Sequence, residues 1–144
     1  MRKLLILLAL SLVTACATDR EALELNATPQ PASPQPDPAM LKDGLATLYY
    51  GSAFDHVDDL VEWTEYREGK PGAPLAGLEH QAGKEDVLTS GASDFVGAQI
   101  TGYLQMPEVG SYRLQVTTND GVRVFLGDAL VHDDPKVGPD RTLE

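Results

Sequence analysis

The 144-residue chain carries 22 acidic and 11 basic residues, a formal charge of −11 at pH 7. This balance argues against nucleic acid as a partner, because neutralising phosphates requires a basic surface. The lone cysteine, Cys16, excludes an internal disulfide.

Residues 1–15 have the organisation of a secretory signal. Two basic residues precede an apolar run from Leu4 to Val13, which is too short to span the ~30 Å of membrane hydrocarbon. The run leads into Val-Thr-Ala-Cys, which resembles the lipobox of bacterial lipoproteins. The resemblance implies cleavage before Cys16 and lipidation of its sulfur. The alternative is an ordinary cleaved signal with an incidental cysteine.

Lipidation would fix the location of the chain. Each buried CH₂ of an acyl chain such as palmitate contributes ~0.8 kcal/mol, so several chains give stable membrane anchoring. The residue after the cysteine is Ala17 rather than Asp, which by resemblance to enteric lipoproteins indicates the outer membrane. We therefore predict a lipid-anchored protein of the bacterial cell envelope, with the membrane as a partner through Cys16.

Residues 16–42 are predicted to be a disordered tether that follows the lipidated cysteine. The part from Asp19 to Met40 holds five of the ten prolines and has no apolar periodicity. Such segments stay extended, partly in polyproline II, and act as semi-rigid spacers.

Residues 43–144 are long enough for one small domain, which the pattern predicts to be β-rich. Short runs of β-forming residues are separated by Gly, Pro and Asp turns. The predicted strands are Leu45–Tyr50, Phe95–Leu104, Tyr112–Thr118, Val122–Leu126 and Ala129–His132.

The last three of these strands are predicted to form a meander. From Tyr112 to Thr118 apolar and polar residues alternate, which is typical of a half-buried strand. The Asp120-Gly121 pair is a strong hairpin signal, because glycine accepts positive φ. A second turn at Gly127-Asp128 leads into the final strand.

Two segments between the predicted strands are less regular. Residues 56–63 read HVDDLVEW, which could form a short amphipathic helix with Val57, Leu60 and Val61 on one face. Residues 67–90 are rich in Gly, Pro and charge, and predict a long surface loop.

The domain resembles the PA14 family, the β-sandwich first named in a bacterial toxin's protective antigen. Three features carry the resemblance: the aromatic pair Tyr49 and Tyr50, the Gly-Tyr-Leu to Gly-x-Tyr run of residues 102–112, and the Asn-Asp-Gly turn before a strand with a Gly-Asp corner. The resemblance implies an antiparallel β-sandwich that binds carbohydrate or mediates adhesion.

The resemblance also implies a ligand site at Asn119, Asp120 and Gly121. In sugar-binding relatives two adjacent aspartates share a cis peptide and ligate Ca²⁺, which in turn accepts sugar hydroxyls. Here Asp120 matches and Asn119 departs from the pattern, although an amide oxygen can ligate Ca²⁺. The alternative is a plain turn, since Asn, Asp and Gly all favour turns without any ligand.

The chain also departs from the family near its C-terminus. The resemblance implies one or two further strands after Ala129–Asp134, whereas the sequence continues only as DPKVGPDRTLE. We therefore expect a sandwich that is C-terminally incomplete, either as a fragment or as a domain completed by another chain.

The sequence lacks the motifs of common enzyme classes, so no catalytic residue is predicted. It has no His-Glu-x-x-His, phosphate loop or Gly-x-Ser-x-Gly motif. Two His/acid clusters, around His56 and around His132, are predicted to be solvated loop residues rather than zinc ligands.

Two functions remain open from the sequence. The first is a non-catalytic, envelope-anchored module that binds surface glycans, with Ca²⁺ as its possible cofactor. The second is a structural or assembly module that docks envelope proteins and has no metal or sugar site. The sequence does not identify a sugar or a partner.

Overall fold

The structure is a computed structural model that describes residues 4–14, 22–27, 31–79, 85–108 and 110–138. These ranges hold eight strands, one α-helix and one 3-10 helix. The elements are β1 Leu4–Thr14, β2 Ala22–Ala27, η1 Pro38–Met40, β3 Ala46–Gly51, α1 Val57–Tyr66, β4 Lys70–Pro71, β5 Val96–Met106, β6 Tyr112–Thr117, β7 Val122–Leu126 and β8 Ala129–Asp134.

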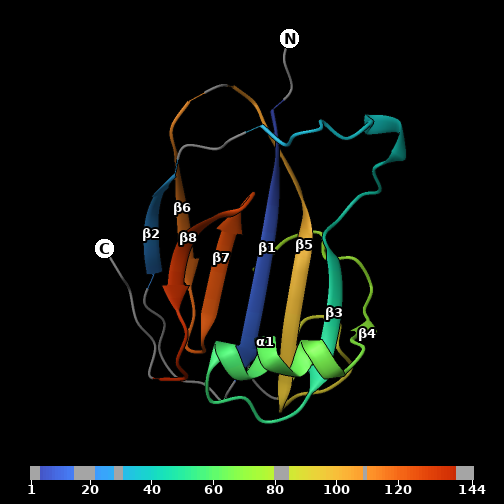
Figure 1. The fold of residues 1–144 in the computed structure, drawn as a ribbon, viewed down its shortest axis with the longest axis vertical. Helices are drawn as coiled ribbons and strands as arrows, with labels where there is room; N and C mark the ends of the chain where they lie inside the picture. Colours follow the sequence, from blue (N-terminus) through green and yellow to red (C-terminus); the bar gives the residue numbers. More distant parts are fainter. Residues whose placement is uncertain (1–3, 15–21, 28–30, 80–84, 109, 139–144) are drawn as a thin grey trace.

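The strands form two antiparallel sheets (Figure 1). The larger has six strands in the order β4-β3-β5-β1-β7-β8, and the smaller pairs β2 with β6. The all-β, antiparallel fold class is therefore confirmed, and β3, β5, β6, β7 and β8 match the five predicted strands to within two residues at either end. Alternating apolar residues and turn signals suffice to place these strands, because both are local features.

The two faces of the large sheet bury different residues, as the two-residue period of a strand requires. Tyr49 joins one core cluster with Ala98, Ile100 and Val124. Its neighbour Tyr50 joins a second cluster on the opposite face. The aromatic pair that carried the family resemblance thus contributes one ring to each side of β3.

The first face is covered by the segment predicted to be a long surface loop. Leu75 pairs with Leu45 through two backbone hydrogen bonds of 2.8 and 2.9 Å, and Leu75 and Val87 are buried. The hydroxyl of Tyr49 lies 2.9 Å from that of Thr89. Most of the described residues of this segment are exposed, as a surface loop requires, but Leu75 and Val87 depart from the prediction because they are buried in the core.

The second face is covered by α1, which crosses the sheet near one end of β1, β5 and β3 (Figure 1). The helix fits there because a Cβ added at Gly97 would lie only 2.5 Å from a methyl of Leu60. Val57 and Leu60 are buried as predicted, but Val61 is 43% exposed, against the prediction. The buried side of the helix runs from Val57 through Leu60 to the half-buried Thr64, and Val61 lies at its margin.

The apolar segment predicted to be a signal forms β1 in the structure of this chain. It pairs with β5 from Leu4 to Thr14 and with β7 from Leu8 to Leu12, so it lies inside the large sheet. Cleavage of residues 1–15 stays a prediction. No helix in the described part of the chain is long and apolar enough to cross a membrane.

Part of the predicted tether also differs from the expectation of disorder. Ala22–Ala27 forms β2, which pairs antiparallel with β6 from Ala22↔Thr117 to Ala27↔Tyr112. Its sequence ALELNA alternates over a few residues, and an available strand edge can capture such a segment. Most of residues 31–44 is exposed, and the role of this segment as a spacer stays a prediction.

Candidate functional site

The turn predicted to bind ligand lies between β6 and β7. The hydroxyl of Thr118 accepts from the Asp120 N–H at 3.1 Å and donates to the Asp120 carbonyl at 3.0 Å. Gly121 allows the close approach of the following chain, because an added Cβ would lie 2.6 Å from the Pro135 carbonyl oxygen. The turn is therefore held both from within and by the segment that follows β8.

Asn119 and Asp120 differ in their access to solvent. Asn119 is partly exposed, whereas Asp120 is 1% exposed and both of its carboxylate oxygens are buried. Among the described residues the cis peptide bond joins Ser33 to Pro34, and not Asn119 to Asp120. The turn thus presents an amide side chain to ligands, while its carboxylate faces inward.

The donor set at this turn is only part of a calcium shell. Within the described ranges no three His, Cys, Asp or Glu side chains gather as metal ligands. Calcium takes six to eight oxygen ligands. Asn119 offers a neutral amide oxygen, and Asp120 offers a charged carboxylate. The described residues alone do not complete such a shell.

The segment 135–138 joins this turn to the start of α1. Gly138 N–H donates to the Asn119 carbonyl at 3.3 Å, and Val137 N–H donates to the Asp55 carbonyl at 3.3 Å. The Pro135 carbonyl accepts from the first N–H of the helix, that of Val57, at 2.8 Å. One short strip of backbone therefore links the turn to the segment before α1.

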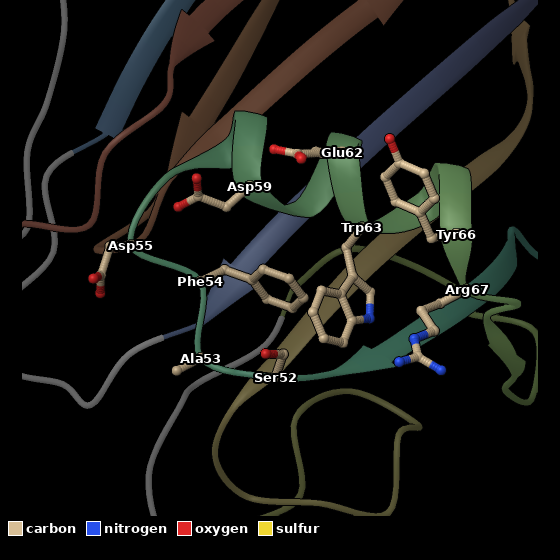
Figure 2. A pocket seen from close by; sticks show the side chains of 9 residues that line it. All are labelled: Ser52, Ala53, Phe54, Asp55, Asp59, Glu62, Trp63, Tyr66 and Arg67. Carbon is tan, nitrogen blue, oxygen red and sulfur yellow. The ribbon is translucent and has the colours of Figure 1, made fainter.

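A pocket of about 450 Å³ lies beside α1, where the chain enters and leaves the helix (Figure 2). Its lining residues come from the segment before the helix and from one side of the helix itself: Ser52, Ala53, Phe54, Asp55, Asp59, Glu62, Trp63, Tyr66 and Arg67. No pattern discussed above predicted this site. The three- and four-residue spacing from Asp59 to Arg67 was the available signal, since it places these side chains on one helix face.

Aromatic rings form the centre of the pocket. Figure 2 shows Phe54 and Trp63 side by side, and their ring centroids lie 6.0 Å apart in an edge-to-face arrangement. The guanidinium of Arg67 lies 5.6 Å from the Trp63 ring centre. Trp63 is 36% exposed and Tyr66 is 72% exposed, so two large aromatic side chains remain accessible at one place.

Charged groups surround these rings. Asp55, Asp59 and Glu62 lie on one side of the pocket and Arg67 on the other (Figure 2). Ionised carboxylates only accept hydrogen bonds and a guanidinium only donates them. The aromatic rings of the pocket can therefore pack against an apolar face of a ligand. Its carboxylates can accept hydrogen bonds from the ligand's polar groups, and its guanidinium can donate hydrogen bonds to them.

The start of α1 is fixed to the sheet by charge. Arg123 in β7 donates to Asp133 at 2.9 Å and to Asp58 at 2.8 Å. These contacts lower the pKa of Asp58, mainly through the Arg123 hydrogen bond. His56 caps the helix by accepting from the Asp58 N–H at 3.1 Å. The His56 cluster is thus the start of a helix, with His56 as its N-cap.

His132 is placed differently from the prediction of a solvated loop residue. It lies within β8 opposite Val124 and is 6% exposed. Burial lowers the pKa of His132 below its ordinary value of 6.5, and the nearby charges of Asp134 and Asp133 oppose that shift. The residue is therefore a buried, neutral imidazole at neutral pH.

Comparison with protein families matches the PA14 domain over residues 42–141. The chain belongs to the PA14 domain family. The match covers the β3–β8 strands, α1 and the Asn119–Gly121 turn, so the predicted resemblance is confirmed. Comparisons with curated proteins and with solved structures gave no match.

Family membership supports the fold and a general role. PA14 domains are β-rich and often bind carbohydrate, which agrees with the antiparallel sheets of this chain. The predicted lipidation site, Cys16, lies outside the described residues. Among the described residues, the α1 pocket and the Asn119–Gly121 turn are both candidate ligand sites.

Proposed function

We propose that this PA14 domain is a non-catalytic carbohydrate-binding module, held at the bacterial envelope by a lipid on Cys16. Membership of the PA14 family carries the proposal, since family members often bind carbohydrate. The α1 pocket supports it with a specific place for the ligand, because pockets of 300–1,000 Å³ with a few polar groups are typical of small-molecule sites.

The chemistry of the pocket suits a pyranose ring. One face of such a ring presents C–H groups that pack on an aromatic surface, here Trp63 and Tyr66. Its hydroxyls both donate and accept hydrogen bonds, which matches the carboxylates of Asp59 and Glu62 and the guanidinium of Arg67. We therefore place the sugar beside α1 in this proposal.

Calcium binding at Asn119 and Asp120 is a second part of the proposal. Asp120 supplies a carboxylate and Asn119 an amide oxygen, and both are oxygen ligands of the kind that Ca²⁺ prefers. Further oxygens would have to come from backbone carbonyls, water or residues outside the described ranges. This part is tested separately, since the α1 pocket contains neither residue.

Glycan-array screening followed by calorimetry tests the sugar proposal. We expect Trp63→Ala and Tyr66→Ala to weaken binding about tenfold or more, which corresponds to roughly 1.4 kcal/mol. Tyr103→Ala is the matched control, because Tyr103 is also an exposed tyrosine, at 39%, but lies on β5 outside the pocket. Equal loss in Tyr103→Ala, or unchanged affinity in Trp63→Ala, would contradict the placement of the sugar.

The alternative is an assembly module that docks envelope proteins. The observation in its favour is the same accessible pair of aromatic side chains, because Trp and Tyr are enriched in protein interfaces. If no glycan binds but Trp63→Ala abolishes co-purification with an envelope protein, this second function replaces the first.

A further inference from the structure

The position of β1 is internal to the large sheet. β1 pairs with β5 along its whole length, from Leu4↔Met106 to Thr14↔Val96. Its residues 8–12 also pair with β7, from Leu8↔Leu126 to Leu12↔Val122. Without β1, neighbouring strands β5 and β7 would each lose a partner, and two open edges would lie inside the sheet.

The residues that flank β1 are among the most buried in the molecule. Ala98 and Ile100 on β5 are 0% exposed, and Val122 and Val124 on β7 are 0% and 1% exposed. Through the pairing register, β1 residues 10 and 12 lie between these two pairs. An empty position would expose unpaired backbone next to a buried apolar surface, which favours capture of another strand.

The same residues form the apolar part of the predicted signal. If the chain is processed before Cys16, cleavage removes the strand that completes the sheet. We propose that the position between β5 and β7 is a strand-binding site, which the processed protein fills with an extended apolar strand from another polypeptide. This inference rests on the signal cleavage included in the proposed function.

The occupant seen in the structure defines the chemistry of the partner strand. β1 reads LLILLALSLVT, eleven residues without charge or proline. It runs antiparallel to β5 and to β7. Each residue from 8 to 12 pairs with both of these strands. A replacement must therefore be apolar, antiparallel, and free of proline over about five central residues, because proline removes a ladder hydrogen bond.

Strand replacement tests the site directly on the full chain. A protease site inserted between residues 15 and 22 allows β1 to be cut from the folded protein, and the fragment is then removed under denaturant. The remainder is refolded with a synthetic peptide of residues 4–14 that carries solubilising lysines at both ends. Hydrogen exchange follows the amides of Val96–Met106 and Val122–Leu126, with the uncut chain refolded in parallel as the reference.

We expect the peptide to restore the amide protection factors of both strands to at least a tenth of those in the uncut reference. The peptide should also elute together with the protein. The matched control peptide carries Leu8→Pro and Leu10→Pro, and it should restore nothing. Protection of β5 and β7 without any peptide, failure of the first peptide to restore it, or equal restoration by the proline peptide would each overturn the proposal. The test requires neither sugar nor lipid, so its outcome is independent of glycan binding.

Discussion

The Nη1 atom of Arg123 lies 2.8 Å from Oδ1 of Asp58, which joins β7 to the first turn of α1. Arg123 also holds Asp133 on β8, at 2.9 Å, and its side chain is only 17% exposed. One guanidinium therefore fixes the helix against two strands. Since α1 lines one side of the ligand pocket, beginning at Asp59 next to Asp58, this contact also bears on the geometry of the candidate site.

The Arg123–Asp58 contact predicts a pH dependence at low pH. Because the folded pKa of Asp58 is lowered from its ordinary value of 3.8, its contribution to stability is present above that value. The contribution is lost as pH falls through the lower folded pKa. Thermal melts from pH 6 to pH 2 should show a smaller loss in Asp58→Asn than in the wild type. An equal loss in both proteins would contradict the assignment.

Gly97 predicts a steric limit beneath α1. An added Cβ would lie 2.5 Å from Leu60 and 2.8 Å from Phe54, both of them buried. We expect Gly97→Ala to cost roughly 1–3 kcal/mol of the free energy of unfolding, as overpacking does elsewhere. Gly51→Ala is the matched control, since nothing lies within 4 Å of its Cβ position. Denaturant unfolding of the two variants compares them, and equal stabilities would show that α1 does not press on the sheet.

His132 predicts a second pH dependence, closer to neutrality. Its folded pKa is lowered from 6.5 by burial, so the unfolded chain binds a proton more readily. Stability should therefore be full above pH 6.5 and should decline as pH falls below it. NMR titration of the imidazole gives the folded pKa, which we expect below 6.5. His132→Phe should flatten the stability profile between pH 7.5 and 5.5, and an unchanged slope would assign the effect to other groups.

The predicted lipidation of Cys16 can be tested in cells. We expect the wild-type protein to incorporate labelled palmitate and to fractionate with membranes. Cys16→Ala should lose the label, because no other cysteine is present to carry a thioether-linked lipid. Uncleaved Cys16→Ala could still associate through its apolar segment, so the label and the size of the product are the decisive readouts. Equal labelling of the two proteins would remove the lipoprotein assignment.

The strands of the domain could be predicted from sequence because alternation and turn residues act locally. Two strands, one in each sheet, could not. Leu4–Thr14 has the composition of a signal, and Ala22–Ala27 lies in a proline-rich context, so only tertiary pairing makes them strands. The prediction for His132 was wrong for a similar reason. His132 pairs with Val124 and so lies on the same buried face of the sheet, which the local sequence does not reveal.

The candidate site could be predicted only in part. The Asn119–Gly121 turn follows from residue types that favour tight turns, but the burial of Asp120 depends on packing that sequence does not show. The α1 pocket requires Phe54 to fold back onto Trp63, across the start of the helix. Its residues lie close in sequence, yet the helix was predicted too short to bring Tyr66 and Arg67 onto the same face.

Calcium provides the final prediction, because the turn offers two variants that change charge in opposite directions. If Asn119 and Asp120 bind Ca²⁺, the ion should stabilise the wild type by RT ln(1 + [L]/Kd), about 2.7 kcal/mol at 100 times Kd. Asn119→Asp should increase this gain, since it adds a carboxylate beside Asp120. Asp120→Asn should abolish it, since it removes the only formal charge of the pair.

Two controls separate calcium binding from turn stability. Asp128→Asn changes an exposed carboxylate in the next turn and should leave the calcium effect intact. Melting in Mg²⁺ should show a smaller gain, because Mg²⁺ demands a tighter octahedral shell and gives up its waters reluctantly. Thermal melts that are insensitive to Ca²⁺ in the wild type and in Asn119→Asp would reject the metal site. The turn would then be a hairpin closed by Thr118 and Gly121, with any glycan bound beside α1 alone.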